Sequence, residues 1–192
     1  MKKQLVLFLV ACSSLLFSSC GYNSLVSLDE SVKKAWGDVE AAYQRRSDLI
    51  GNLVETVKGE AKFEKDVLTS VMEARAKATS IQIKADDVNA DNIQKFQEAQ
   101  SQLSGALSRL LAVSENYPNL KATQAYSDLM TELEGTENRI NIARKDYNEA
   151  VQAYNTKARS FPTNITAGLF KFKPKDMFKS DPGTEKAPKV QF

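Results

Sequence analysis

The chain has 192 residues, with 26 lysine or arginine and 24 aspartate or glutamate side chains, and it contains no histidine. Lys2 and Lys3 account for the net charge of +2, so the remainder is balanced, which argues against a nucleic-acid-binding protein with its net basic face. The absence of histidine excludes histidine acid–base catalysis, histidine-containing triads and histidine metal ligands. Both cysteines, Cys12 and Cys20, lie near the N-terminus, so we expect no thiol catalysis, zinc site or disulfide in the rest of the chain.

The first 20 residues resemble the signal peptide of a bacterial lipoprotein. Two lysines precede the apolar stretch Leu5–Phe17, which is shorter than the about 20 residues that span a bilayer. Small residues then lead to Cys20, which we expect to be lipidated and to become the new N-terminus. Cleavage before Cys12 is an alternative, but it would leave an apolar region of only about seven residues. An uncleaved, short membrane anchor is a further alternative, and it too places the rest of the chain outside the cytoplasm.

The next segment has the composition and the apolar spacing of a helix. Apolar residues recur in alternating steps of three and four between residues 25 and 57, which is typical of a helix with one buried face. The run Ser27–Glu30 has the capping-box pattern and predicts the helix start. We expect the turn after this helix within Lys58-Gly59-Glu60, because glycine suits the position that follows a helix end. Gly51 would then lie at a kink inside the helix. A turn at Gly51 is the alternative.

Apolar spacing predicts three further helices, which cover residues 61–81, 91–116 and 118–161. Asp91 with Gln94 predicts the N-terminal cap of the second of these. Tyr117 and Pro118 indicate a tight hairpin turn, because proline in the first turn of a helix loses no hydrogen bond. Pro162 prevents the last helix from continuing.

Helix lengths predict how these elements are arranged, because each residue adds about 1.5 Å of height. A single rod over residues 27–81 would leave the first apolar stripe without a partner, whereas a turn at Gly59 lets all four helices overlap. We therefore predict an all-α fold for residues 21–162, an antiparallel up-down-up-down four-helix bundle with a C-terminal tail.

The tail differs in composition from the bundle. Residues 163–179 mix phenylalanine and other apolar residues with lysines. We expect this segment to fold back on an end of the bundle. The alternative is an interfacial segment that touches acidic lipid. Residues 180–192 are polar and rich in proline, which predicts disorder.

Four stretches resemble the LemA family: YNSLVSLDESVKKAWGDVE (22–40), YQRRSDLIGNLVETVKGEA (43–61), ENYPNLKA (115–122) and GTENRINIARKDYNEAVQAYN (135–155). They cover most of the chain after residue 20, and Phe161-Pro162 follows them. The resemblance implies a membrane-attached, all-helical protein outside the cytoplasm. Typical members have an uncleaved N-terminal helix, often a proline at the position of Gly51, and often a histidine near Phe63.

Several polar residues fall on or beside the apolar stripes and form a predicted polar spine: Arg45, Arg46, Glu134, Glu137, Arg144 and Asn148. Arg46 is level with Glu134 and Glu137 in the four-helix arrangement, so we predict that Arg46 or Arg45 pairs with one of them. A ligand pocket lined by Arg46, Glu137 and Arg144 is the alternative.

Two Tyr-Asn pairs lie seven residues apart on the last helix, at Asn148 and Asn155. The asparagine side chains would either bind the inner part of the tail or present their amides to a partner. Trp36 is expected in the core.

No set of residues completes a catalytic site, so the sequence favours a non-enzymatic protein without cofactor or metal. We expect a lipid-anchored envelope protein that contacts the membrane through Cys20 and binds an unknown envelope protein as a scaffold or interaction module. A small-ligand- or lipid-binding bundle is the alternative. Gly21 is not the aspartate associated with inner-membrane retention, so the periplasmic face of the outer membrane is favoured in a Gram-negative host.

Overall fold

The computed structural model describes the backbone of residues 2–59 and 63–179, and the side chains of those residues from Gly21 onward. All regular secondary structure in these ranges is helical, as predicted. The helices are α1 (Lys2–Lys58), α2 (Lys65–Ser80), α3 (Ala90–Ser114), α4 (Pro118–Lys121), α5 (Gln124–Arg159) and α6 (Thr163–Leu169). The tail predicted to be disordered, residues 180–192, lies outside the described residues.

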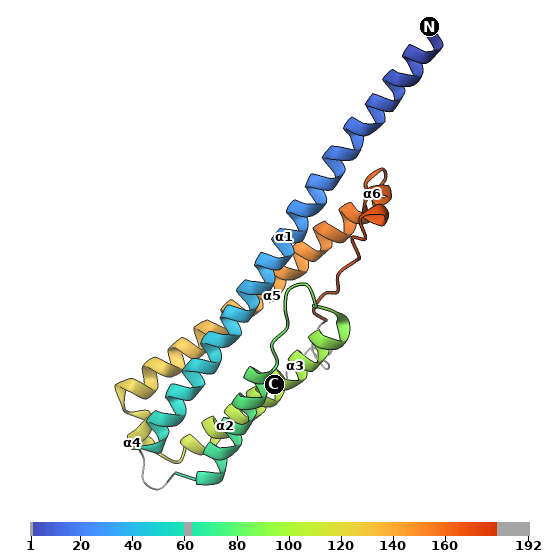
Figure 1. Cartoon of the computed structure of the whole chain (residues 1–192). Helices are drawn as coiled ribbons and strands as arrows, with labels where there is room; N and C mark the ends of the chain where they lie inside the picture. Colours follow the sequence, from blue (N-terminus) through green and yellow to red (C-terminus); the bar gives the residue numbers. More distant parts are fainter. Residues whose placement is uncertain (1, 60–62, 180–192) are drawn as a thin grey trace, which may run out of the picture.

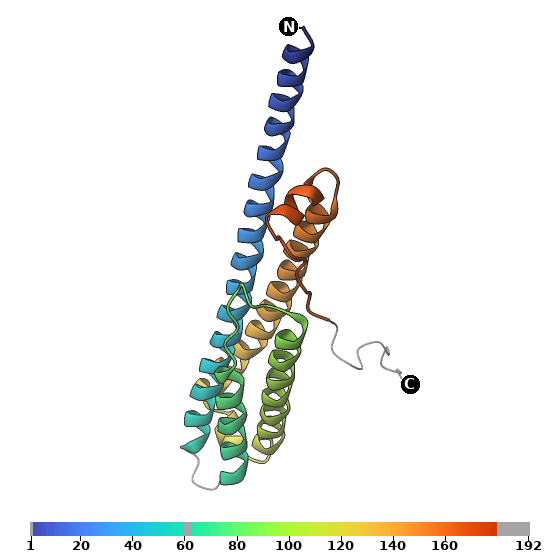
Figure 2. The same ribbon diagram turned by 45° about the vertical axis from the view of Figure 1, so that its right-hand side comes forward.

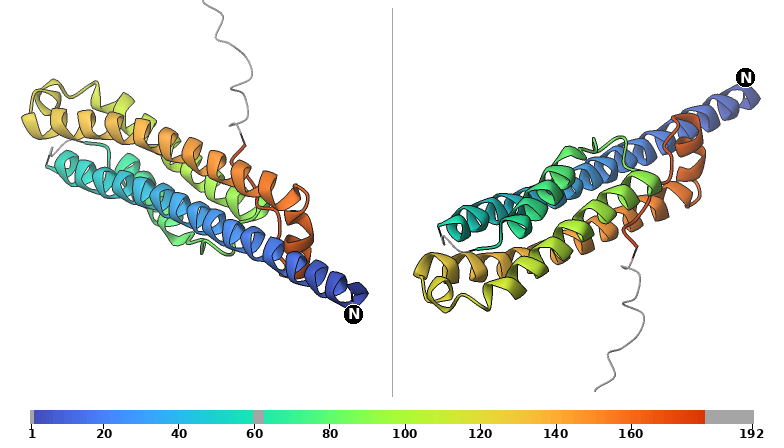
Figure 3. Two further views of the ribbon diagram at one scale, coloured as in Figure 1. Left: turned by 90° about the horizontal axis from the view of Figure 1, so that it is seen from above. Right: turned by 90° about the horizontal axis from the view of Figure 1, so that it is seen from below.

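Two antiparallel helix pairs make up the body of the molecule. The long helices α1 and α5 lie side by side and run in opposite directions, while α2 and α3 form a shorter antiparallel pair beside the C-terminal half of α1 (Figures 1 and 2). The short helix α6 packs on both α1 and α5. The backbone of residues 2–20 continues α1 past α6, and it projects beyond every other helix (Figure 3).

The core consists of two apolar clusters along the length of the molecule. One surrounds Trp36 and contains Tyr147 and Tyr154 from α5, and the other surrounds Leu53 and contains residues of α2 and α3. On α1, Arg46 lies between these clusters and is only 6% exposed. Burial of the apolar stripe, at about 25 cal/mol per Å², is the main force that orders the helices.

The turn after α1 lies at Gly59, whose N–H donates to Thr56 O at 3.3 Å. Residues 60–62 of this turn lie outside the described residues. Helix α1 continues through Gly51 without interruption.

The predicted start of the first helix is wrong. Ser27 lies inside α1, and Glu30 contacts Lys33 at 3.2 Å instead of capping a helix end. The helix extends further toward the N-terminus because Leu25 is fully buried in the first apolar cluster, so packing stabilises a turn that precedes the capping-box pattern.

Two other predicted helix starts are also displaced. Asn89, and not Asp91, caps α3, because its Oδ1 accepts the Asn92 N–H at 3.0 Å. Pro118 begins only the single-turn helix α4; Thr123 then adopts an extended conformation, and its side chain caps the separate helix α5.

Candidate functional site

A polar layer crosses the interior where the two apolar clusters meet. Nη1 of Arg46 lies 3.3 Å from Oε2 of Glu137 on α5, and Nη2 donates to Oγ of Ser104 on α3. The Arg46 side chain is 8% exposed and that of Glu137 is 55% exposed, so the pair bridges core and solvent. A buried guanidinium needs such partners, and the layer therefore ties three helices together at one height.

The other residues of the predicted spine do not join this layer. Arg45 contacts Glu132 at 2.5 Å on the surface, and Glu134 is exposed. Arg144 lies over the ring of Phe178 and donates to Lys179 O at 3.2 Å. The pocket expected from three of these residues is therefore not formed as predicted, because Arg144 turns toward the chain that follows α6.

Gly51 allows an arginine from α2 to approach α1 closely. A Cβ atom placed at Gly51 would lie 3.2 Å from Cζ of Arg75. Nε of Arg75 donates to Ser47 O at 2.7 Å, and its Nη2 lies 3.7 Å from Asp48. Glycine at position 51 thus makes room for the contact between α1 and Arg75 of α2. The position of Gly51 in the sequence does not reveal this role.

The most elaborate polar arrangement holds residues 171–179, here called the strap, along α5. Asn155 accepts the Lys175 N–H at 2.9 Å and donates to Lys175 O at 2.8 Å. Asn148 accepts the Phe178 N–H at 2.9 Å and donates to Phe178 O at 3.1 Å. Each asparagine amide therefore binds both backbone groups of one strap residue.

The two tyrosines beside these asparagines bind the same segment. Tyr147 donates its hydroxyl proton to Asp176 O at 3.0 Å, and Tyr154 donates to Lys173 O at 3.0 Å. Burial, together with the charge of Asp176, raises the pKa of Tyr147 well above its usual range. Both tyrosines thus stay protonated and act as donors. The two Tyr-Asn pairs of the sequence form a ladder that binds an extended backbone.

Aromatic packing seats the strap in the core. Phe178 stacks on Trp36 with ring centroids 5.8 Å apart and an interplanar angle of 15°. The indole N–H of Trp36 donates to Ile83 O at 2.9 Å, in the connection between α2 and α3. Trp36 therefore joins the strap, α1 and this connection, and the strap is part of the folded core.

An ion pair fixes the middle of the strap to α1. Nζ of Lys175 lies 2.7 Å from Asp29, and Lys33 contacts the same carboxylate at 3.2 Å. Partial burial opposes the charged form of Asp29, but the hydrogen bonds from both lysines outweigh it and hold its pKa below the usual 3.8.

The turn residues Tyr117 and Pro118 lie at the opposite end of the molecule from α6. The ring of Tyr117 packs against Phe63 with centroids 5.0 Å apart. Cys20 belongs to α1, but its side chain lies outside the described residues. Among the side chains of residues 21–59 and 63–179, no three acidic groups converge as metal ligands would.

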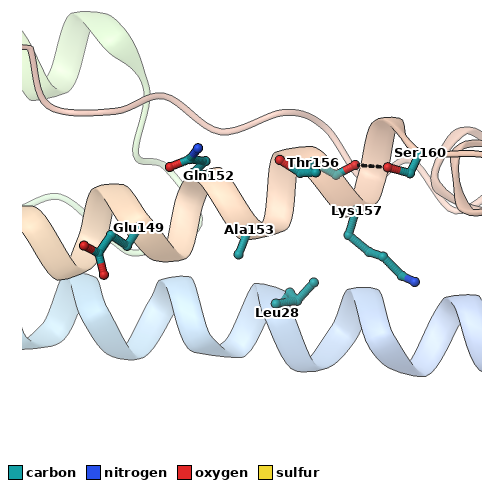
Figure 4. A pocket seen from close by; sticks show the side chains of 7 residues that line it. All are labelled: Leu28, Glu149, Gln152, Ala153, Thr156, Lys157 and Ser160. Atoms are coloured by element: carbon teal, nitrogen blue, oxygen red, sulfur yellow. Dashed lines mark hydrogen bonds between the residues drawn. The ribbon is translucent and has the colours of Figure 1, made fainter.

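A shallow groove runs between α1 and α5, with a volume of about 570 Å³ and a wide opening to solvent. In Figure 4, Leu28 of α1 faces Ala153 of α5, and Glu149 and Lys157 flank them.

No helix of the described part of the chain has the length and hydropathy of a transmembrane segment.

The sequence left two alternatives open for both asparagines, and the structure shows the first, in which they bind the inner part of the tail. The contribution of Tyr147 and Tyr154 to the ladder was not predicted. The spacing of seven residues was the available signal, because it places both amides on one face of α5. The backbone that they bind is far away in the sequence, and its return along α5 has no local signal.

The family model described as the LemA family matches residues 35–192. Magnetosome protein MamQ 2 of Paramagnetospirillum magneticum is 27% identical over 179 residues, which is 84% of this chain and 65% of that protein. Magnetosome protein MamQ of Magnetospirillum gryphiswaldense is 26% identical over 179 residues, which again is 84% of this chain and 65% of that protein. Protein LemA of Metamycoplasma hominis is 26% identical over 145 residues, which is 76% of this chain and 63% of that protein. The chain thus spans less than two thirds of the length of these curated relatives.

Proposed function

The chain belongs to the LemA family, and from this premise we propose that it is a non-enzymatic, membrane-attached protein of the cell envelope that acts as a scaffold or interaction module. In this proposal, the lipoprotein signal peptide of residues 1–20 is cleaved before Cys20, which becomes the N-terminus and carries the lipid, and residues 21–162 form an up-down-up-down four-helix bundle. The strap and α6 complete the bundle, and the partner is another envelope protein.

The observation that supports the proposal is the contact of Gly21 with α6. The backbone of residues 2–20 projects beyond α6, and this segment contains the apolar stretch Leu5–Phe17 (Figure 1). Gly21 already packs on α6, because a Cβ there would lie 3.5 Å from Oγ1 of Thr166. A lipid on Cys20 would therefore attach at the first residue of the packed domain, without an intervening linker. Two or three acyl chains give a stable anchor, whereas one gives weak binding.

The interior contacts support a structural role for the buried polar groups. Arg46 is engaged by Ser104 and Glu137, and the strap residues occupy the aromatic side of the core. A scaffold of this kind presents its outer faces to a partner. In a Gram-negative host, Gly21 after Cys20 favours the periplasmic face of the outer membrane.

A small-ligand- or lipid-binding bundle is the second candidate. The groove between α1 and α5 favours it, because Leu28 and Ala153 give its floor an apolar surface (Figure 4). This groove lies away from the residues first expected to bind a ligand, and its wide opening provides little enclosure.

Replacement of the two cysteines tests the anchor. We expect Cys20→Ala to abolish the mass increase of the acylated N-terminus and incorporation of labelled fatty acid. Cys12→Ala is the matched control, because it changes the other cysteine of the same stretch. Lipid on Cys12, or a full-length chain with an unmodified Cys20, would contradict the proposed anchor.

Crosslinking in intact cells tests the scaffold role. Photo-crosslinkers at exposed positions of α5, such as Asn138 and Lys145, should capture a reproducible envelope protein. The same positions in the Cys20→Ala chain form the control, because the partner should be lost when the protein leaves the membrane. Repeated capture of no protein would count against the interaction module.

A further inference from the structure

Helix α6 turns apolar side chains outward. Thr163 and Ala167 are buried against α1 and α5, whereas Ile165 and Leu169, also four residues apart, are 64% and 75% exposed. A surface helix of a water-soluble domain normally has the opposite arrangement, with its apolar face inward. The outward face of α6 therefore lacks a partner in the described part of the chain.

Two phenylalanines extend this face. Phe161 is 81% exposed just before α6, and Phe170 is 55% exposed just after it. Lys171 has a φ of 60°, and the Phe172 N–H donates to Ala167 O at 2.9 Å. This left-handed cap ends the helix and turns the strap away while Phe170 stays at the surface. The α6 patch is defined as Phe161, Ile165, Leu169 and Phe170.

The α6 patch lies next to the start of the packed domain. Gly21 of α1 packs on Thr166 of α6, and the ring of Tyr22 lies 4.8 Å from that of Phe170. Figures 1 and 2 show α6 at the end of the molecule from which the N-terminal part of α1 projects. Any anchor in the first 20 residues therefore brings the patch to the lipid surface.

The charge at this end fits an anionic surface. Residues 1–28 and 150–175, which supply α6 and its surroundings, contain no aspartate or glutamate. Arg159, Lys171 and Lys173 are exposed beside the α6 patch. Exposed apolar side chains flanked by cations are the features that hold interfacial segments in anionic bilayers.

We infer that the α6 patch inserts into the headgroup region of an anionic bilayer and forms a second membrane contact beside the N-terminal anchor. This inference rests on the membrane attachment of the proposed function. The patch alone binds weakly, but the anchor makes its contact effectively intramolecular, so the two attachments reinforce each other. Together they orient α1 and α5 relative to the membrane, with the Gly59 turn pointing away from it.

Tryptophan quenching tests this contact in the full, lipidated chain. Leu169→Trp adds an exposed aromatic group to the patch, and Ile142→Trp does so at a 52% exposed site on α5, roughly 25 Å from the end of that helix. Trp36 is 1% exposed in the core, so the unchanged chain provides the background. Each protein is placed in phosphatidylglycerol-containing vesicles whose acyl chains carry bromine.

We expect bromine to quench Leu169→Trp and to leave Ile142→Trp unchanged. Addition of Ile165→Asp to the Leu169→Trp chain should reduce the quenching, because a charge on the same face resists insertion. Equal fluorescence of Leu169→Trp with and without bromine, in vesicles that carry the protein, would overturn the inference. A spectral change that follows protein concentration and not bromine would assign the face to a second copy of the chain, and would also overturn it.

Failure of the anchor is measured separately, by the mass at Cys20 and by flotation with vesicles. A chain that lacks the lipid is mixed with the same vesicles. Quenching of Leu169→Trp then still supports the α6 contact, although the proposed anchor has failed. Unquenched fluorescence of Leu169→Trp in the fraction of chains that floats with the vesicles would overturn the α6 contact as well.

Discussion

Truncation of Asn148 should release the C-terminal part of the strap without unfolding the helices. Asn148→Ala removes two hydrogen bonds, to the N–H and the carbonyl of Phe178. At about 1 kcal/mol net for each bond, local stability should fall by about 2 kcal/mol. The Phe178 amide should then exchange with solvent roughly 30-fold faster, since 1.4 kcal/mol corresponds to a factor of about ten.

Native-state hydrogen exchange measures this effect at single amides. The exchange rate of the Lys175 amide should rise by much less than that of the Phe178 amide, because Asn155 still binds both backbone groups of Lys175. Asn148→Asp should give an intermediate result, because one carboxylate oxygen still accepts the Phe178 N–H while the other faces a carbonyl.

Asn138→Ala provides the matched control, because Asn138 is exposed on the same helix. This substitution should leave the exchange rates of the Lys175 and Phe178 amides unchanged. Unchanged protection of Phe178 in Asn148→Ala would refute the reasoning, and would mean that packing of the Phe178 ring on Trp36 holds this part of the strap without the amide.

Three further experiments test the remaining contacts by chemical denaturation. The double mutant of Arg46→Ala and Glu137→Ala should lose less stability than the sum of the single mutants, by about 0.5–1 kcal/mol, because the carboxylate of Glu137 is half exposed to solvent. Strict additivity would contradict the ion pair. Gly51→Ala should stabilise an Arg75→Ala chain by about 1 kcal/mol and should stabilise the unaltered chain by less, because the added Cβ displaces the Arg75 guanidinium. Equal effects in both chains would exclude that contact. The pKa of Asp29 is lower in the folded state, so its stabilisation is present above pH 3.8 and is lost as the pH falls through the folded-state value. Asp29→Asn should remove this part of the acid dependence, and an unchanged pH profile would argue against it.

The polar layer shows that residue spacing alone can predict a contact between two helices. A helix rises by a constant amount per residue, so a turn at Gly59 is enough to put Arg46 level with Glu137. The two side chains lie in contact at 3.3 Å. Ser104 was not expected as a partner, because the rotation of α3 about its axis depends on how α2 and the connection after it pack.

The start of α1 illustrates the opposite case. The capping-box pattern at Ser27 is a local signal, and it predicts a helix end that the molecule does not have. Leu25 is buried by residues distant in the sequence, and that burial outweighs a cap worth about 1 kcal/mol. Tertiary packing can therefore override a local sequence pattern that predicts a helix start.

The helical class and the buried faces follow from the sequence, because apolar periodicity and helix-forming composition act over a few turns of chain. Membership in the LemA family follows from the match of the family model over residues 35–192. The strap, the role of Gly51 and the outward face of α6 were decided only by the tertiary structure. Each of them joins segments 20 or more residues apart, such as Asn155 with Lys175, Gly51 with Arg75 and Gly21 with Thr166. Such contacts form only after the helices have packed, since packing fixes which distant backbone or side chain comes within hydrogen-bonding or van der Waals distance.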